Sequence, residues 1–156
     1  MKKRINRKVA LLAALAVGVV FGSLAYSHCQ VPCGIYGDDT RFQLIAEHIA
    51  TIEKSMVQIG ENMNQDPPNG NQIVRWVNNK EKHADEISHI VTYYFMAQRV
   101  KLPPEGDREA QGAYVKKLTL LHKMLVYSMK AKQTTDLSNV HQLRDLLEDF
   151  KKAYSG

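Results

Sequence analysis

The sequence predicts an all-α protein, an antiparallel four-helix bundle preceded by a short N-terminal hook. Apolar residues recur every three or four positions through four segments, and polar or proline-rich stretches separate those segments. Both cysteines of the chain lie in one further stretch, HCQVPCGIY at residues 28–36, which defines the hook. Four amphipathic helices joined by short loops pack most simply as an antiparallel bundle.

The first two predicted helices flank a turn-forming stretch, NQDPPNG, at residues 64–70. Asp38 or Asp39 can cap the first helix. Its apolar stripe has the spacing 3-4-3-4-3 and consists of Phe42, Ile45, Ile49, Ile52, Met56 and Ile59. The second helix stops before the stretch PPEG at residues 103–106. Its apolar positions are Ile73, Trp76, Val77, Ala84, Ile87, Ile90, Val91, Tyr94 and Phe95.

The third and fourth predicted helices are separated by the stretch TTD at residues 134–136. We expect the third helix to bury Tyr114, Leu118, Leu121, Leu125 and Ser128. The stripe of the fourth has the spacing 3-4-3-4 and consists of Val140, Leu143, Leu147, Phe150 and Tyr154. Neither a strand alternation nor a glycine-rich phosphate loop competes with this pattern, so residues 37–156 are predicted to form the four-helix bundle domain.

Residues 1–27 have the order of a cleaved secretory signal peptide. Five positive charges and no negative charge in residues 1–8 precede an apolar run, and Ala25-Tyr26-Ser27 places small residues one and three positions before a cut between Ser27 and His28. The chain is therefore expected to be exported, to a periplasmic or extracellular location. An uncleaved membrane anchor is the alternative, since residues 9–26 number 18, but the small residues at the cleavage site favour removal.

Leader removal also changes the charge of the protein. The leader takes five of the 21 Lys and Arg residues and none of the 16 Asp and Glu residues, which leaves 16 of each in a mature chain of 129 residues. That length suits one domain with one core. The mature charge balance gives no reason to expect a nucleic-acid partner, and no stable membrane association is expected after cleavage.

One candidate metal site lies inside the predicted bundle. Glu86 and His89 form a Glu-x-x-His pair on the second helix, the spacing found in di-metal bundles. Such centres need a second Glu-x-x-His pair, which this sequence lacks. Glu86 and His89 are therefore interpreted as surface or core-edge residues.

The hook offers a different set of metal ligands if His28 becomes the first residue. His28 then supplies a free amine and an imidazole, Cys29 an amide nitrogen and a thiolate, and Cys33 a second thiolate. Pro32 bends the chain and Gly34 permits a tight backbone path. Two nitrogens and two sulfurs can form a planar set with the imidazole in an axial position, which favours nickel or copper over tetrahedral zinc.

A disulfide between Cys29 and Cys33 is the alternative interpretation of the same stretch. An exported protein meets an oxidising compartment, and the two cysteines are close enough in sequence to bridge. A bridge that closes so short a loop adds little stability. It also leaves unexplained why the pair begins at the second residue of the predicted mature chain, so metal binding is preferred.

The stretch HCQVPCGIY resembles the hook His-Cys-x-x-Pro-Cys-Gly-x-Tyr of nickel-containing superoxide dismutases at every fixed position. The resemblance implies a homohexamer of four-helix bundles with one nickel ion per subunit, which converts superoxide to oxygen and hydrogen peroxide through a Ni(II)/Ni(III) cycle. It makes His28, Cys29 and Cys33 the metal ligands. It also gives Tyr36 a catalytic role near the open face of the metal, where it orders water and limits what enters.

The chain departs from that family at two places. Better-known members hold the axial imidazole with a glutamate early in the first helix and an arginine in the second. This chain has Leu44 or Ile45 and His83 at roughly those places, with Glu47 one turn away. Its secretory leader also differs from the pro-segment that other members can carry. An exported nickel- or copper-binding delivery protein without turnover is the alternative function.

Overall fold

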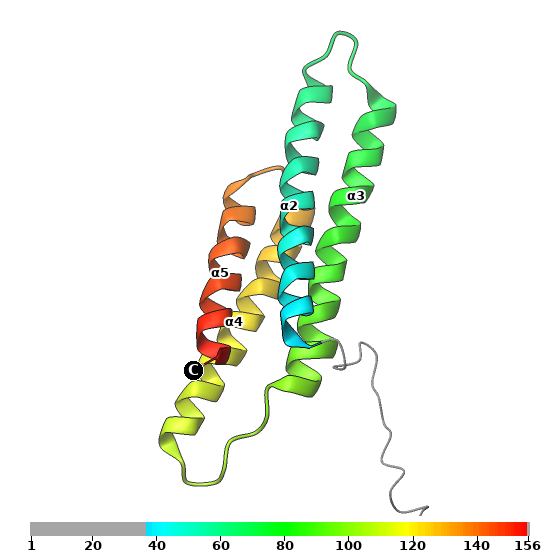
Figure 1. The fold of residues 1–156 in the computed structure, drawn as a ribbon. Coiled ribbons are helices and arrows are strands. Elements are labelled where there is room, and N and C mark those ends of the chain that lie inside the picture. Colours follow the sequence, from blue (N-terminus) through cyan, green and yellow to red (C-terminus); the bar gives the residue numbers. More distant parts are fainter. Residues whose placement is uncertain (1–36, 156) are drawn as a thin grey trace, which may run out of the picture. The chain divides into compact units, whose positions relative to one another are not determined.

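A computed structural model describes residues 37–155, which form helices joined by short loops (Figure 1). Helix α2 spans Asp38–Met63, α3 spans Gly70–His89, α4 spans Arg108–Gln133 and α5 spans Ser138–Ser155. Helix α3 continues directly into a π-helix, η2, over Ile90–Arg99. No strand occurs within residues 37–155, so the all-α prediction is confirmed for this range. The predicted signal peptide and hook lie outside the described residues.

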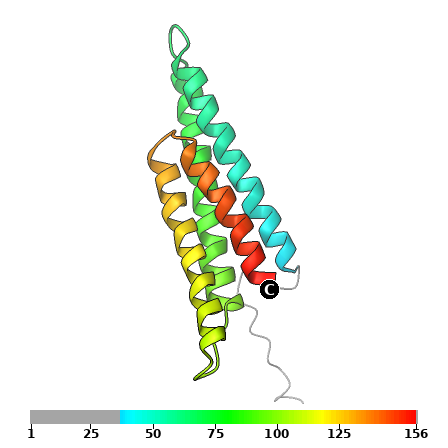
Figure 2. The ribbon, with the colours of Figure 1, turned by 90° about the vertical axis from the view of Figure 1, so that its left-hand side faces the viewer.

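The four helices run up, down, up and down along a common direction, as both ribbon views show (Figures 1 and 2). Helix α2 packs against α3 and α5, and α4 packs against the same two neighbours. Each helix therefore contacts two others around one core. This arrangement is the antiparallel four-helix bundle that the four periodic segments predict.

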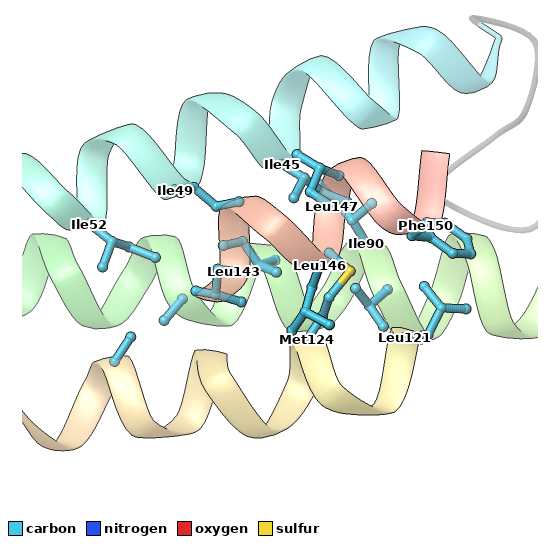
Figure 3. Close-up of a cluster of buried hydrophobic side chains, with 14 of the residues drawn as sticks. Ile45, Ile49, Ile52, Ile90, Leu121, Met124, Leu143, Leu146, Leu147 and Phe150 are labelled. Carbon is cyan, nitrogen blue, oxygen red and sulfur yellow. The ribbon is translucent and has the colours of Figure 1, made fainter. Parts of the chain in front are cut away.

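The predicted apolar stripes of α2 and α5 form much of the core. All six stripe residues of α2 are buried, and so are four of the five in α5, with Tyr154 half-buried. Figure 3 shows side chains from both helices meeting those of α4 and η2. The fully or nearly fully buried members include Ile45, Ile49, Ile52, Ile90, Leu121, Met124, Leu143, Leu147 and Phe150.

The second predicted stripe is buried from Ala84 onward, whereas Ile73, Trp76 and Val77 are only half-buried. The reason is visible at Lys80, whose ammonium group donates to the carbonyls of Ala131, Lys132 and Thr134 at the C-terminal end of α4. Helix α4 therefore ends level with Lys80. Residues 70–79 of α3 extend beyond this end of α4 (Figure 2).

The predicted stripe of the third helix is partly wrong. Leu121 and Ser128 are buried as expected, but Tyr114, Leu118 and Leu125 are only half-buried. The other buried positions of α4 are Leu120, Met124 and Ala131. At 3.6 residues per turn, leucines at 118, 120, 121 and 125 spread over an arc of about 160°, which includes both the expected face and the buried one, so periodicity alone does not identify the buried face.

The predicted cap of the first helix is wrong as well. Gly37 occupies the N-cap position with φ +78°, and no side chain caps α2. Asp38 is instead the first helical residue, and its carboxylate binds side chains of two other helices, while Asp39 is exposed. Side-chain caps occur at the next two helices, where Asn69 accepts from Gln72 N and Asp107 accepts from Ala110 N.

Candidate functional site

The predicted ligands His28, Cys29 and Cys33 and the predicted catalytic residue Tyr36 lie outside the described residues. The described chain begins one residue later, at Gly37, so it shows the place where the hook joins the bundle. A φ of +78° is one that glycine adopts readily and other residues rarely do. The glycine therefore sets the direction in which the chain enters α2.

Asp38 is the next residue, and its carboxylate joins three elements of the bundle. Its Oδ1 accepts a hydrogen bond from the Tyr94 hydroxyl at 2.5 Å, and its Oδ2 accepts one from the Tyr154 hydroxyl at 2.8 Å. Arg99 binds both oxygens, with Nε 2.8 Å from Oδ1 and Nη2 2.8 Å from Oδ2. Bidentate arginine-carboxylate contacts are among the strongest hydrogen-bonded pairs in proteins. Helices α2, η2 and α5 are thereby tied together at one carboxylate.

The π-helix explains how Tyr94 and Arg99 both reach Asp38. These residues are five positions apart, and in an α-helix that spacing directs side chains to different faces. A π-helix has hydrogen bonds between residues five apart, as Val100 N donates to Phe95 O at 2.9 Å. Residues 94 and 99 therefore stack along one face, which delivers a hydroxyl and a guanidinium group to the same carboxylate.

The cluster has fixed charges at neutral pH. Burial acts to raise the pKa of Asp38, but hydrogen bonds from Arg99, Tyr94 and Tyr154 outweigh it and hold the pKa below its ordinary value. Burial and the hydrogen bond to Asp38 raise the pKa of Tyr94 to about 12, and the same two causes raise the pKa of Tyr154. The aspartate is thus ionised, and both tyrosines remain neutral donors.

Aromatic rings pack against the two tyrosines that bind this carboxylate. Phe95 packs against Phe42 with ring centres 5.0 Å apart, against Tyr94 at 5.1 Å and against Tyr154 at 5.7 Å. The guanidinium of Arg41 lies 5.2 Å from the centre of the Tyr94 ring, close enough for a cation-π interaction. The side chain of Asp38 is only 22% exposed.

A second polar contact lies between α2 and α3, where Nδ1 of His48 is 2.8 Å from Nδ1 of His83. The ring centres are 5.0 Å apart. This separation is longer than the Nδ1–Nδ1 distance by about the sum of the two ring radii. Both nitrogens therefore lie near the line that joins the ring centres. Two imidazoles that bind one metal ion direct their lone pairs to a common point about 2.0–2.1 Å from each nitrogen. This head-on arrangement instead fits a hydrogen atom shared between the rings.

The remaining residues singled out from the sequence have ordinary environments. Glu86 is half-buried and His89 is exposed, as expected of surface or core-edge residues. Within residues 37–155, no group of three or more His, Cys, Asp or Glu side chains is arranged to hold a metal ion. Ile45 is fully buried in the core and Leu44 packs at its edge, so neither offers a polar group to a neighbouring imidazole.

The Asp38 cluster and the histidine pair were both missed by sequence reasoning. One signal was available for the cluster, because a buried tyrosine normally needs a partner for its hydroxyl group and Tyr94 was expected on a buried stripe.

None of the described helices combines the length and apolar character that crossing a membrane requires.

Comparison with known proteins extends the description to the hook. A family model described as nickel-containing superoxide dismutase matches residues 23–156, a range that includes the hook and all four helices. No curated protein and no solved structure shows a significant match. Because the matched range covers most of the sequence, the chain belongs to the nickel-containing superoxide dismutase family and is an oxidoreductase.

Proposed function

We propose that this superoxide dismutase holds one nickel ion per subunit in the hook of residues 28–36 and uses a Ni(II)/Ni(III) cycle at its processed N-terminus. The family match supports this proposal because it covers residues 23–156 and therefore contains the whole hook. The sequence HCQVPCGIY has each fixed residue of the family's hook. Superoxide is the substrate, and oxygen and hydrogen peroxide are the products.

The donor atoms of the hook fit nickel. His28 would supply its amine and imidazole, Cys29 its amide nitrogen and thiolate, and Cys33 its thiolate. Nitrogen and sulfur donors suit the late first-row metals, nickel and copper included. When bound, nickel supplies a one-electron redox couple that the side chains of the protein do not have. The two thiols and the amide must lose their protons for this set to form, so binding requires near-neutral or higher pH.

The protein's own groups have two tasks in the reaction. One superoxide loses an electron to give oxygen, while a second gains an electron and two protons to give hydrogen peroxide. The chain must therefore admit a small anion and deliver protons to it. Tyr36 is the proposed residue for both tasks, because a phenol at the mouth of the site narrows the entrance and orders a water molecule through its hydroxyl.

Maturation is part of the proposal, because the ligand set exists only after cleavage between Ser27 and His28. While Ser27 is attached, the nitrogen of His28 belongs to a peptide bond and is not an amine. Removal of residues 1–27 would follow export to the periplasm or the exterior of the cell. The mature subunits would assemble as homohexamers without stable membrane association.

A native intact mass of the protein purified from its own host tests these statements together. We expect a hexamer of chains that begin at His28, each with one nickel ion. Metal-free chains that begin at His28 with a mass two hydrogens lower would indicate a Cys29–Cys33 disulfide instead. Chains that retain residues 1–27 would contradict the proposed maturation. Resistance of the bound metal to a mild chelator separates a resident catalytic ion from cargo for delivery.

A further inference from the structure

We propose that Asp38 is a positioning residue for the dismutase reaction, because it fixes the root of the nickel-binding hook to the bundle. This inference rests on the proposed function of residues 28–36. Asp38 follows Tyr36 by two residues and Cys33 by five. Since an extended chain spans at most about 3.6 Å per residue, only a short length of chain joins Asp38 to the hook.

Asp38 makes more contacts than an aspartate needs in order to stabilise the first turn of a helix. An aspartate in the first turn stabilises a helix through the helix dipole while it remains exposed to solvent, and the exposed Asp39 already satisfies that description. Asp38 instead turns its carboxylate inward. There it accepts hydrogen bonds from Tyr94, Arg99 and Tyr154, which belong to two other elements.

Those three donors hold the first turn of α2 from two directions. Tyr94 and Arg99 approach from the C-terminal part of the second helical segment, whereas Tyr154 comes from the last turns of α5. Helix ends fray when few contacts hold them to the rest of the protein, and here the side chain of Asp38 is held by three donors. The first turn of α2 is therefore an anchored end, and the chain that precedes it starts from a fixed point.

The Asp38 carboxylate also contributes a negative charge at the start of α2, where the hook joins the bundle. Arg99 and Arg41 both lie near the ring of Tyr94, at 5.7 Å and 5.2 Å from its centre. The ionised Asp38 carboxylate forms the ion pair with Arg99. Its replacement by a neutral amide would leave the guanidinium of Arg99 without its carboxylate and weaken the hydrogen bonds from both tyrosines.

The expected consequence is a change in the chemistry of the hook, not only in stability. Displacement of reacting groups by about 1 Å can reduce a rate by a factor of about 100. For the nickel-loaded, full-length mature enzyme, we expect Asp38→Asn to retain bound nickel but to lower kcat by roughly tenfold to a hundredfold. We also expect a shifted or broadened electron paramagnetic resonance signal of Ni(III), which reports the surroundings of the metal directly.

Asp39→Asn is the matched control, because it removes the same charge from the same helical turn without touching the cluster. We expect this variant to keep the kcat, the KM and the Ni(III) signal of the parent enzyme. If Asp38→Asn has the parent's kcat and Ni(III) signal even while its melting temperature falls, Asp38 is only a structural residue and the inference is wrong.

Tyr154→Phe provides a second test should Asp38→Asn fail to fold. It removes one donor to Oδ2 and keeps the aromatic packing, so a smaller change in the same direction is expected. An unchanged Ni(III) signal and kcat in Tyr154→Phe would then overturn the inference. Failure of the proposed function is distinguishable, because the parent chain itself would then lack hook-bound nickel or dismutase activity.

Discussion

His48 and His83 share a hydrogen atom across the interface between α2 and α3, with their Nδ1 atoms 2.8 Å apart. One ring must donate and the other must accept. The neutral pair and the singly protonated pair can both keep this bond. The doubly protonated pair cannot, since each Nδ1 then carries a hydrogen. Burial lowers the pKa of His48, and the charge of His83 lowers it further, while Glu86 and Glu47 act in the opposite direction.

From the His48–His83 pair we predict that the bundle loses stability in mild acid. The ordinary histidine pKa is about 6.5 and the folded pKa of His48 is lower, so the unfolded chain binds more protons between the two values. The free energy of unfolding should therefore be highest above pH 6.5 and fall as the pH decreases from there through the folded pKa. Urea unfolding at a series of pH values between 8 and 5 measures this slope.

His48→Gln should reduce that pH dependence, because the variant removes the group whose pKa differs between the folded and unfolded states. His122→Gln is the control, since His122 is exposed on α4. An equal slope in the parent and in His48→Gln would show that the pair does not contribute to the acid sensitivity.

Lys80 is predicted to stabilise the C-terminal end of α4. Its side chain is buried, and its Nζ donates to Ala131 O at 2.7 Å and to Thr134 O at 3.0 Å. Lys80→Met should lower the free energy of unfolding by about 1–3 kcal/mol, because it leaves helix-terminal carbonyls without donors. Thermal unfolding against Lys82→Met, an exposed lysine on the same helix, isolates the effect. Similar melting temperatures in the two variants would contradict the proposed role.

The buried face of α4 can be tested by comparing two apolar truncations. Met124 is fully buried, whereas Leu118 is half-buried. Met124→Ala should cost about 2–5 kcal/mol through lost burial and cavity formation, and Leu118→Ala should cost clearly less. Denaturant midpoints at equal m-values give the ranking. A larger loss for Leu118→Ala would mean that the face expected from the sequence, centred on residues 114, 118 and 125, is the buried one.

The parts of this protein that the sequence predicts well are those governed by local rules. The stripe of α2 repeats without interruption between Gly37 and the turn at residues 64–70, so its buried face follows from helix geometry. The proposed hook, which lies outside the described residues and stays a prediction, is equally local, because its five proposed donor groups come from three residues within a stretch of six. Covalent spacing alone brings such groups within reach of one another.

The contacts that the sequence does not predict join distant residues. Asp38 forms hydrogen bonds with Tyr94 and Tyr154, which lie 56 and 116 positions away in the sequence. No periodic pattern in the sequence indicates such contacts. The π-helix adds to the difficulty, because it places residues five apart on one face in a segment where α-helical spacing was assumed. The face of α4 was missed for a different reason, since its leucines are too widely distributed around the helix.

Tyr36→Phe should separate metal binding from substrate handling. The variant removes one hydroxyl group and none of the proposed ligands, so one nickel ion per chain should remain bound. The substrate concentration that half-saturates the enzyme should change, because the hydroxyl orders water at the proposed entrance. Metal analysis and superoxide kinetics by pulse radiolysis measure the two properties separately. Loss of nickel from Tyr36→Phe would mean that the tyrosine supports the ligand set instead.

Extension of the proposed mature chain by one residue tests the proposed terminal amine. A glycine placed before His28 converts that amine into a peptide nitrogen and leaves every side chain in place. Nickel binding and dismutase activity should both be lost, because the proposed set then lacks one of its nitrogens. A glycine added after Gly156 is the matched control and should change neither property. Intact mass under native conditions verifies each N-terminus and counts the metal in the same measurement. An extended enzyme with full activity would show that the amine is dispensable, and the ligand set would then consist of the Cys29 amide nitrogen, the two thiolates and the imidazole.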